Sequence, residues 1–145
     1  MAGRNPTNGH LVLVGPTASG KSALALEVAR HRSGTELVSV DSMAVYRSMD
    51  IGTATPTSAE KKEIRHHLID LVEPTEEFTL AMFQTAAHGV LDDLKLQGCR
   101  AVLVGGTGLY LRSVVDPLRI PPRYPGVRRR LEADLDTEAL HNCLF

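Results

Sequence analysis

The sequence predicts a single α/β domain built on a parallel sheet with flanking helices. Three short apolar runs carry this prediction, at residues 11–14, 37–40 and 101–104, and each is nearly continuous rather than alternating. Such runs are typical of strands that are buried on both faces, as in parallel sheets. Helical patterns lie between them, so strands and helices alternate along the chain. The 145 residues suffice for one such domain and not for two.

Three helices are predicted between and after these strands. The first spans about residues 22–32, with Gly34 as its stop. The second spans about 80–97 and ends at Gly98, because Thr79 can cap it and apolar residues recur on one face: Phe83, Ala87, Val90, Leu91 and Leu94. The third spans about 108–115, after a glycine-rich turn. Residues 43–74 show weak periodicity, and a connection of this length predicts function or a small helical excursion.

Composition and charge exclude several classes of protein. With 43% hydrophobic and 23% charged residues the chain is not disordered, and a net charge of −1 excludes a uniformly basic nucleic-acid binder. The charge is nevertheless uneven, because residues 112–130 contain six arginines and one aspartate, a net +5 against −6 elsewhere. Four prolines in this stretch predict an extended, positively charged connector that leads into a short helix.

No feature of the sequence predicts secretion or membrane insertion. The apolar runs fall far short of the roughly 20 residues that span a bilayer. The polar residues 1–10 lack the apolar segment of a signal peptide. The two cysteines, Cys99 and Cys143, form neither a disulfide framework nor a metal-binding pair. We therefore expect a cytoplasmic location.

The strongest local motif follows the first predicted strand and fits the pattern G-x-x-x-x-G-K-[ST]. Its residues are Gly15, Pro16, Thr17, Ala18, Ser19, Gly20, Lys21 and Ser22. A strand before it and a helix after it are the context that a phosphate-binding loop requires. The glycines let backbone N–H groups surround an anion, Lys21 adds a positive charge, and the Ser22 hydroxyl is placed to bind Mg²⁺. The motif predicts a phosphate-binding site on a P-loop nucleoside-triphosphate-hydrolase-like fold and does not say which reaction follows.

The residues after the other strands narrow the chemistry. An ATPase needs a carboxylate after a second strand to hold Mg²⁺, whereas the run at 101–104 ends in Gly-Gly-Thr. Asp41 follows the run at 37–40, where an acid is better interpreted as a base or orienting group for an acceptor. A plain turn or cap role for Asp41 is the competing interpretation. His66 and His67 have no acid or cysteine at metal-ligand spacing, so a structural or substrate-loop role is expected.

Four motifs in order resemble the bacterial tRNA dimethylallyltransferase family, also called isopentenyl-tRNA transferases. The motifs are the phosphate loop, the segment 41–54, the segment His-His-Leu-Ile-Asp at 66–70, and Gly-Gly-Thr-Gly-Leu-Tyr at 105–110. The resemblance covers about residues 11–131. One departure is Ala44, where many relatives carry glutamine. Another is length, since the family continues through a helical insertion into a returning C-terminal half.

The resemblance implies transfer of a dimethylallyl group from dimethylallyl diphosphate to N6 of an adenosine adjacent to the tRNA anticodon, with release of pyrophosphate. The phosphate loop and Mg²⁺ would hold the diphosphate, and Thr17 would touch it near the reacting carbon. Asp41 would be the general base. Contacts to tRNA would come from Asp41, Ser42, Met43, Ala44, Thr107 and Arg128. The resemblance further implies a monomer in the full-length form.

The same resemblance divides the chain into a phosphate-loop core, residues 1–116, and a basic connector that begins the helical insertion, residues 117–145. The family's C-terminal half would be absent. Two alternatives remain at this point. One is a P-loop nucleoside or small-molecule kinase, and the other is a non-catalytic, truncated fragment that retains the phosphate loop.

Overall fold

The computed structural model describes residues 9–50, 55–116, 118–134 and 136–142. Four strands form one sheet, and all neighbouring strands are parallel. The order across the sheet is β1 (Leu11–Val14), β4 (Arg100–Gly105), β2 (Thr35–Ser39) and β3 (His66–His67). The predicted α/β class with a parallel sheet is confirmed. Within the described ranges, no helix is long and apolar enough to cross a membrane.

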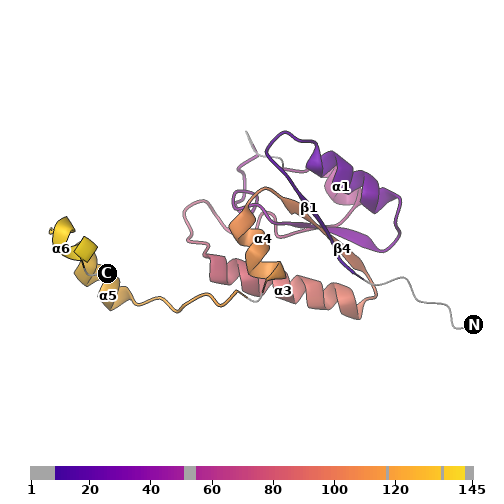
Figure 1. Ribbon diagram of the computed structural model, residues 1–145. Coiled ribbons are helices and arrows are strands. Elements are labelled where there is room, and N and C mark those ends of the chain that lie inside the picture. Colours follow the sequence, from indigo (N-terminus) through magenta and orange to yellow (C-terminus); the bar gives the residue numbers. More distant parts are fainter. Residues whose placement is uncertain (1–8, 51–54, 117, 135, 143–145) are drawn as a thin grey trace, which may run out of the picture.

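Helices cover both faces of this sheet. Helix α1 (Lys21–Arg30) lies on one face, and α3 (Leu80–Leu96) and α4 (Gly108–Val115) lie on the other (Figure 1). Two apolar clusters fill the spaces between these layers. Ala25, Leu26 and Ala29 of α1 pack on Leu37 and Val102. The larger cluster lies under α3 and contains Phe83, Ala87, Leu94 and Leu103. The face predicted for the long helix is therefore confirmed.

Strand β1 departs from the prediction that each apolar strand is buried on both faces. It lies at the edge of the sheet and pairs only with β4 among the described strands. Leu11 and Val12 are each 41% exposed, and Val14 is 55% exposed. Leu13 packs against the cluster under α1. The prediction of burial on both faces holds for β2 and β4 and is wrong for β1. A strand at the sheet edge has one neighbour and is less well covered, and an apolar run does not reveal whether its strand lies at the edge.

The segment between β2 and α3 contains two short elements. Helix α2 (Ser58–Glu63) confirms the expected helical excursion and begins with a capping box, in which Thr57 and Glu60 bond to each other's backbone N–H groups. Strand β3 pairs with β2 and was not predicted. Its two residues are too few to show a periodicity, so only pairing with β2 makes it a strand.

The ends of the longer helices follow their local signals. The Thr79 hydroxyl accepts a hydrogen bond from Met82 N at 3.2 Å and caps α3. Gly34 and Gly98 adopt φ values of 69° and 70°, the left-handed conformation that commonly follows a helix. Helix α1 runs from Lys21 to Arg30, slightly earlier than predicted, while α4 spans the expected residues.

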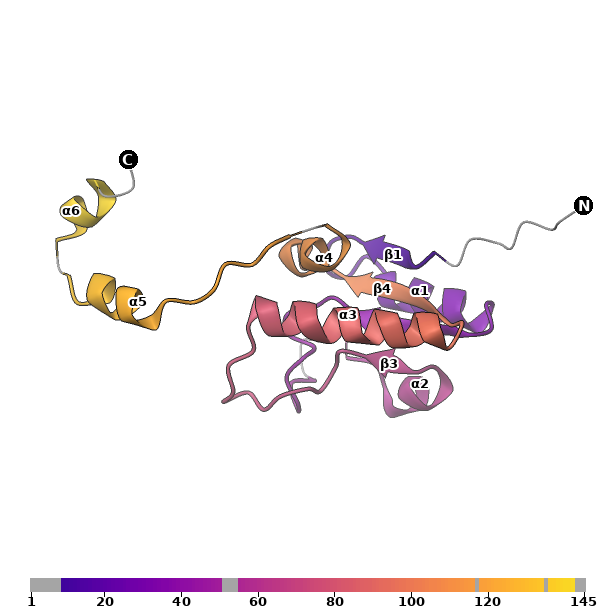
Figure 2. The same ribbon diagram turned by 90° about the horizontal axis from the view of Figure 1, so that it is seen from below.

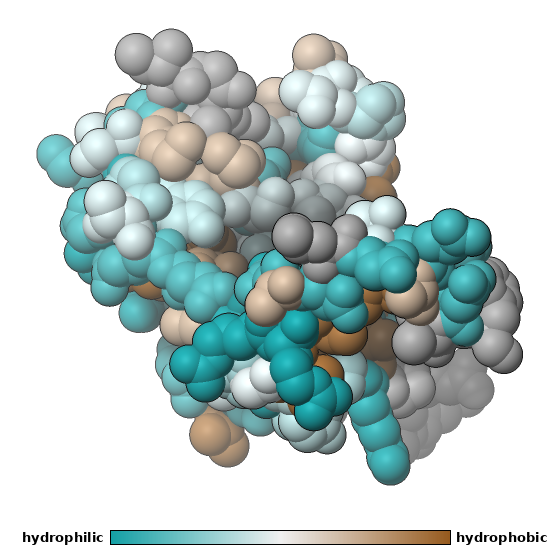
Figure 3. Space-filling view, turned by 90° about the vertical axis from the view of Figure 1, so that its left-hand side faces the viewer, coloured by the Kyte–Doolittle hydropathy of each residue, from teal (hydrophilic) through white to brown (hydrophobic). Residues whose placement is uncertain are grey.

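The C-terminal part of the chain lies away from the sheet. Residues 118–124 form an extended segment that leads to α5 (Pro125–Glu132), and α6 (Thr137–Asn142) follows (Figure 2). Gln84 of α3 donates to Ser113 O at 2.7 Å and to Leu118 O at 3.0 Å, where this segment leaves the core. Arg123 forms an ion pair with Glu77. The end of the molecule seen in Figure 3 is mainly hydrophilic. An extended stretch leading to a short helix is confirmed, whereas a domain boundary at 116–117 stays a prediction.

Candidate functional site

The loop between β1 and α1 has the conformation that the phosphate-loop motif predicts. Residues 16–20 are exposed, and α1 begins at Lys21. Gly20 caps the helix with φ at 80°, a conformation that costs glycine nothing. Ala18 adopts φ at 62°, which is unusual for a residue with a side chain. The helix thus presents its first backbone N–H groups beside an open loop, the arrangement that attracts an anion.

Lys21 lies across this loop. Its Nζ donates to Pro16 O at 2.5 Å and lies 3.5 Å from Ser19 Oγ. Both partners belong to the loop itself, so the ammonium group is held where an anion in the loop would meet it. Lys21 therefore faces the loop and not the core, as expected.

The end of β2 carries Asp41. Its Oδ1 accepts a hydrogen bond from Met43 N at 2.8 Å, which closes a tight turn. The competing interpretation of Asp41 as a turn residue is therefore realised in the structure. The turn uses Oδ1 and leaves Oδ2 outside it, so the same carboxylate remains suited to a proton from an acceptor.

The end of β4 meets the end of β2. Thr107 Oγ1 accepts a hydrogen bond from Ser42 N at 3.3 Å and makes no side-chain cap on α4. Gly105 is buried, and a Cβ there would lie 2.5 Å from Val40 O. A Cβ on Gly106 would lie 3.4 Å from Gly15 O. The glycines in the sequence Gly-Gly-Thr therefore let the ends of three strands approach one another.

A cavity of about 1030 Å³ opens at these strand ends. It is lined by the whole phosphate loop, by Asp41, Ser42, Met43 and Ala44, and by Thr107. Every site residue predicted from the sequence, except Arg128, therefore lines one cavity. Ligands in open α/β sheets bind beyond the carboxyl ends of the strands, which is where this cavity lies.

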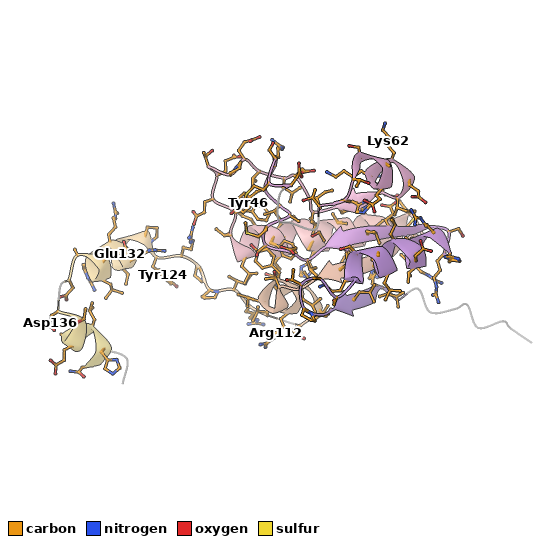
Figure 4. The ribbon with its side chains drawn as sticks, turned by 90° about the horizontal axis from the view of Figure 1, so that it is seen from above. Tyr46, Lys62, Arg112, Tyr124, Glu132 and Asp136 are labelled. Carbon is orange, nitrogen blue, oxygen red and sulfur yellow. The ribbon has the colours of Figure 1, made fainter. Side chains whose placement is uncertain are left out.

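Arg128 lies outside this cavity. It belongs to α5, is exposed, and its Nε lies 2.7 Å from Glu132 Oε1. Figure 4 shows Tyr124 and Glu132, which flank it in sequence, well away from the sheet. The structure therefore does not bring Arg128 together with the phosphate loop.

The family comparisons agree with this geometry. The IPP transferase family matches residues 44–145, which is more than half of the chain, and the isopentenyl transferase family matches residues 9–77.

The chain belongs to the IPP transferase family.

Curated relatives carry the name tRNA dimethylallyltransferase. The Corynebacterium diphtheriae protein is 46% identical over 143 residues, which cover 97% of this chain and 47% of that protein. The Pseudarthrobacter chlorophenolicus protein is 47% identical over 125 residues, which cover 86% of this chain and 42% of that protein. The chain therefore spans less than half the length of these relatives.

Solved structures of the family share the fold. The full-length tRNA isopentenylpyrophosphate transferase of Bacillus halodurans is 38% identical, with a TM-score of 0.73 over 95% of this chain and 47% of that chain. A eukaryotic dimethylallyltransferase acting on tRNA is 26% identical, with a TM-score of 0.80 over 94% of this chain and 35% of that chain. The expected P-loop type of fold is confirmed, and the kinase alternative loses its support.

Several lining residues of this IPP transferase chain were not predicted as site residues. They form part of the cavity wall: Leu26, Leu37, Ser39, Glu60, His66 and Ile69. Leu26 and Leu37 have ordinary core positions in the sequence, so no local signal marks them. His66 belongs to a motif already noted, but its place in the cavity depends on the pairing of β3 with β2.

Two titratable groups in this wall have shifted pKa values. Burial lowers the pKa of His66, whose Nδ1 lies 2.7 Å from Ile64 O. Hydrogen bonds from the Thr57 side chain and backbone lower the pKa of Glu60. The wall therefore presents a neutral imidazole and an ionised carboxylate near pH 7.

The metal that the motif implies has few protein ligands available. Among the described residues, no group of three or more His, Cys, Asp or Glu side chains could hold a metal ion. Ser22 supplies one hydroxyl oxygen at the start of α1. Mg²⁺ commonly keeps several waters and binds through substrate phosphates with few protein ligands, so these residues fit an ion held mainly by a diphosphate.

Proposed function

We propose that this chain forms the donor and acceptor site of a tRNA dimethylallyltransferase. The observation that carries the proposal is the single cavity that joins the phosphate loop to Asp41 and Thr107. A phosphate loop beside a carboxylate suits a reaction in which a diphosphate leaves while a nucleophile loses a proton. The names of the relatives and the structural neighbours support the same class of reaction.

The proposed reaction begins with attack of the adenosine N6 amine on C1 of dimethylallyl diphosphate. The new N6–C1 bond forms while the bond between C1 and the diphosphate oxygen breaks, and both electrons of that bond leave with pyrophosphate. Asp41 accepts the proton that N6 loses. The adenine must leave its stack to reach Asp41, because the carboxylate lies at the end of a strand beside the cavity.

The phosphate loop stabilises the charge that develops on the leaving group. Backbone N–H groups at the start of α1 and the Lys21 ammonium provide this stabilisation, and Thr17 contacts the diphosphate near C1. Ser22 would hold Mg²⁺, which supplies further neutralisation of the leaving group when bound.

The acceptor is held by other groups that line the same cavity. Asp41 to Ala44 and Thr107 lie there, at the ends of β2 and β4. Arg128 and its neighbours would bind tRNA phosphates from the connector, outside the cavity. We further propose that the complete protein acts as a cytoplasmic monomer.

The replacement Lys21→Ala tests the phosphate loop. We expect the affinity for pyrophosphate to fall by about tenfold or more, because a charge-assisted contact to an anion is typically worth about 1.5–3 kcal/mol. Isothermal titration calorimetry of the chain with pyrophosphate and Mg²⁺ measures this. Lys62→Ala is the matched control, since Lys62 is exposed on α2 and points away from the sheet (Figure 4). Equal pyrophosphate affinities of wild type and Lys21→Ala would refute the loop assignment.

The basic connector predicts a salt-dependent affinity for RNA. Each phosphate contact on a single strand contributes a log–log slope of about −0.7 against salt concentration. We expect replacement of Arg128, Arg129 and Arg130 by glutamine to reduce the steepness of that slope by about 2 for an unmodified anticodon stem-loop. The control is the replacement by glutamine of three exposed cations that lie outside the connector: Arg32, Lys62 and Lys95. An unchanged slope in the connector variant would make these arginines a solvated surface.

Whether the chain acts alone is decided by a direct comparison. Transfer of a labelled prenyl group to unmodified tRNA is measured for the 145-residue chain and for a version extended to the length of its relatives. We expect turnover only from the extended version, which would support the interpretation of this chain as a non-catalytic portion. Multiple turnover by the 145-residue chain would contradict that interpretation.

A further inference from the structure

The second half of the acceptor loop, which we define as residues 41–47, is bound to the segment that follows β3. Asp70 N donates to Ala44 O at 3.0 Å, and Leu71 N donates to Val45 O at 2.7 Å. Arg47 N in turn donates to Val72 O at 2.9 Å. The loop that carries Asp41 is therefore held by main-chain contacts to residues 70–72, which lie in neither β2 nor β4.

The Arg47 side chain reinforces these contacts with all three of its nitrogen positions. Its Nε donates to Asp70 O at 2.9 Å and its Nη2 to Leu71 O at 3.1 Å, while Nη1 lies 3.1 Å from Glu73 Oε1. A guanidinium can serve several acceptors in one plane, which an ammonium cannot reproduce. The Arg47 side chain is 51% exposed, so the ion pair with Glu73 contributes little to stability by itself.

The segment that Arg47 contacts has an unusual backbone. Leu68 and Asp70 adopt φ values of 60° and 53°, although neither is glycine. Non-glycine residues keep this strained backbone conformation only where the surrounding contacts enforce it, and such residues cluster at ligand sites. Ile69, between them, lines the cavity wall. Lys61 Nζ holds the turn from the side of α2, 2.7 Å from Asp70 Oδ2.

We propose that Arg47 is a positioning residue for the acceptor, acting through the turn at residues 68–70 to hold the loop that carries Asp41. This role rests on the proposed function, in which residues 41–44 meet the target adenine. The turn supplies a cavity-wall residue, Ile69, and binds the acceptor loop at Ala44 O. Removing the guanidinium loosens the acceptor loop but leaves the phosphate loop as it was, since the Arg47 side chain bonds to Asp70, Leu71 and Glu73 and not to that loop.

The test compares two affinities of one variant. We expect Arg47→Met to lower the affinity for an unmodified anticodon stem-loop RNA by about tenfold, because a loosened loop must be ordered when the RNA binds. Its affinity for pyrophosphate with Mg²⁺ stays within about twofold of wild type, whereas a general loss of folding would lower both affinities. Arg47→Lys retains the positive charge but lacks the planar guanidinium that serves several acceptors, so it should weaken RNA binding to a similar extent. Arg30→Met is the control, since Arg30 pairs with Glu27 and Glu63 outside the cavity.

A second measurement does not depend on RNA. Amide hydrogen exchange at residues 43–47 should accelerate in Arg47→Met, with exchange in α1 unchanged. Asp70→Asn, which tolerates the same φ but loses the pair with Lys61, should accelerate exchange in the same residues.

The outcomes separate the two proposals. Equal RNA affinities and equal amide exchange in the loop of wild type and Arg47→Met would overturn the role of Arg47 and leave the proposed function standing. Parallel losses of RNA and pyrophosphate affinity would also overturn it. A wild-type chain that binds pyrophosphate but not the RNA would overturn the proposed acceptor and, with it, this role.

Discussion

Replacement of Asp41 by asparagine is expected to reduce the rate of prenyl transfer by about 10²- to 10⁴-fold, which is the typical contribution of a general base. Asparagine keeps the size of the side chain and its Oδ1, so it can still accept the hydrogen bond from Met43 N that closes the turn. What it loses is the ability to take a proton. The variant therefore separates the two interpretations of Asp41, because a pure turn residue would tolerate this change.

The measurement is single-turnover transfer of a labelled prenyl group to unmodified tRNA, in a chain extended to the length of its relatives. Pyrophosphate affinity serves as the internal control and should not change, since the phosphate loop is intact. Asp92→Asn provides a matched comparison, because Asp92 is an exposed carboxylate on α3 and does not line the cavity. A rate for Asp41→Asn within a few-fold of wild type would exclude Asp41 as the base.

Replacement of Gly105 by alanine is expected to destabilise the chain by about 1–3 kcal/mol or more, as overpacking of a buried site does. A Cβ at this position would lie 2.5 Å from Val40 O, 2.7 Å from Val40 C and 2.9 Å from Val40 Cγ2. Two of these three atoms belong to the backbone, so the end of β4 must move away from β2. That movement would also pull Thr107 away from Ser42 N and so weaken the tie between the strand ends.

Gly89→Ala is the matched control for this prediction. Gly89 lies within α3, and nothing is within 4 Å of a Cβ built there. Alanine at this exposed helical position should stabilise the chain by about 0.5–1 kcal/mol. Urea unfolding of the three chains, followed by circular dichroism, measures the differences. A Gly105→Ala variant as stable as wild type would show that the strand ends are not closely packed in solution.

Local signals in the sequence determined much of this fold. The phosphate loop, the capping of α3 by Thr79 and the bounds of α4 depend on contacts between residues near one another in the chain, so the pattern of residue types was sufficient to predict them. The same holds for Asp41, because an acid directly after a buried strand lies at the ligand-binding edge of a parallel sheet wherever that strand lies. The family could also be identified from its four ordered motifs.

The tertiary structure decided the features that depend on pairing between distant segments. Strand β3 has two residues and exists only because it pairs with β2, and this pairing carries His66 into the cavity wall. The exposure of β1 follows from its place at the sheet edge, which an apolar run does not encode. Likewise, Arg47 contacts the turn at 68–70 across more than twenty residues of sequence. Composition and spacing describe single segments, whereas these contacts are set by which segments become neighbours when the core packs.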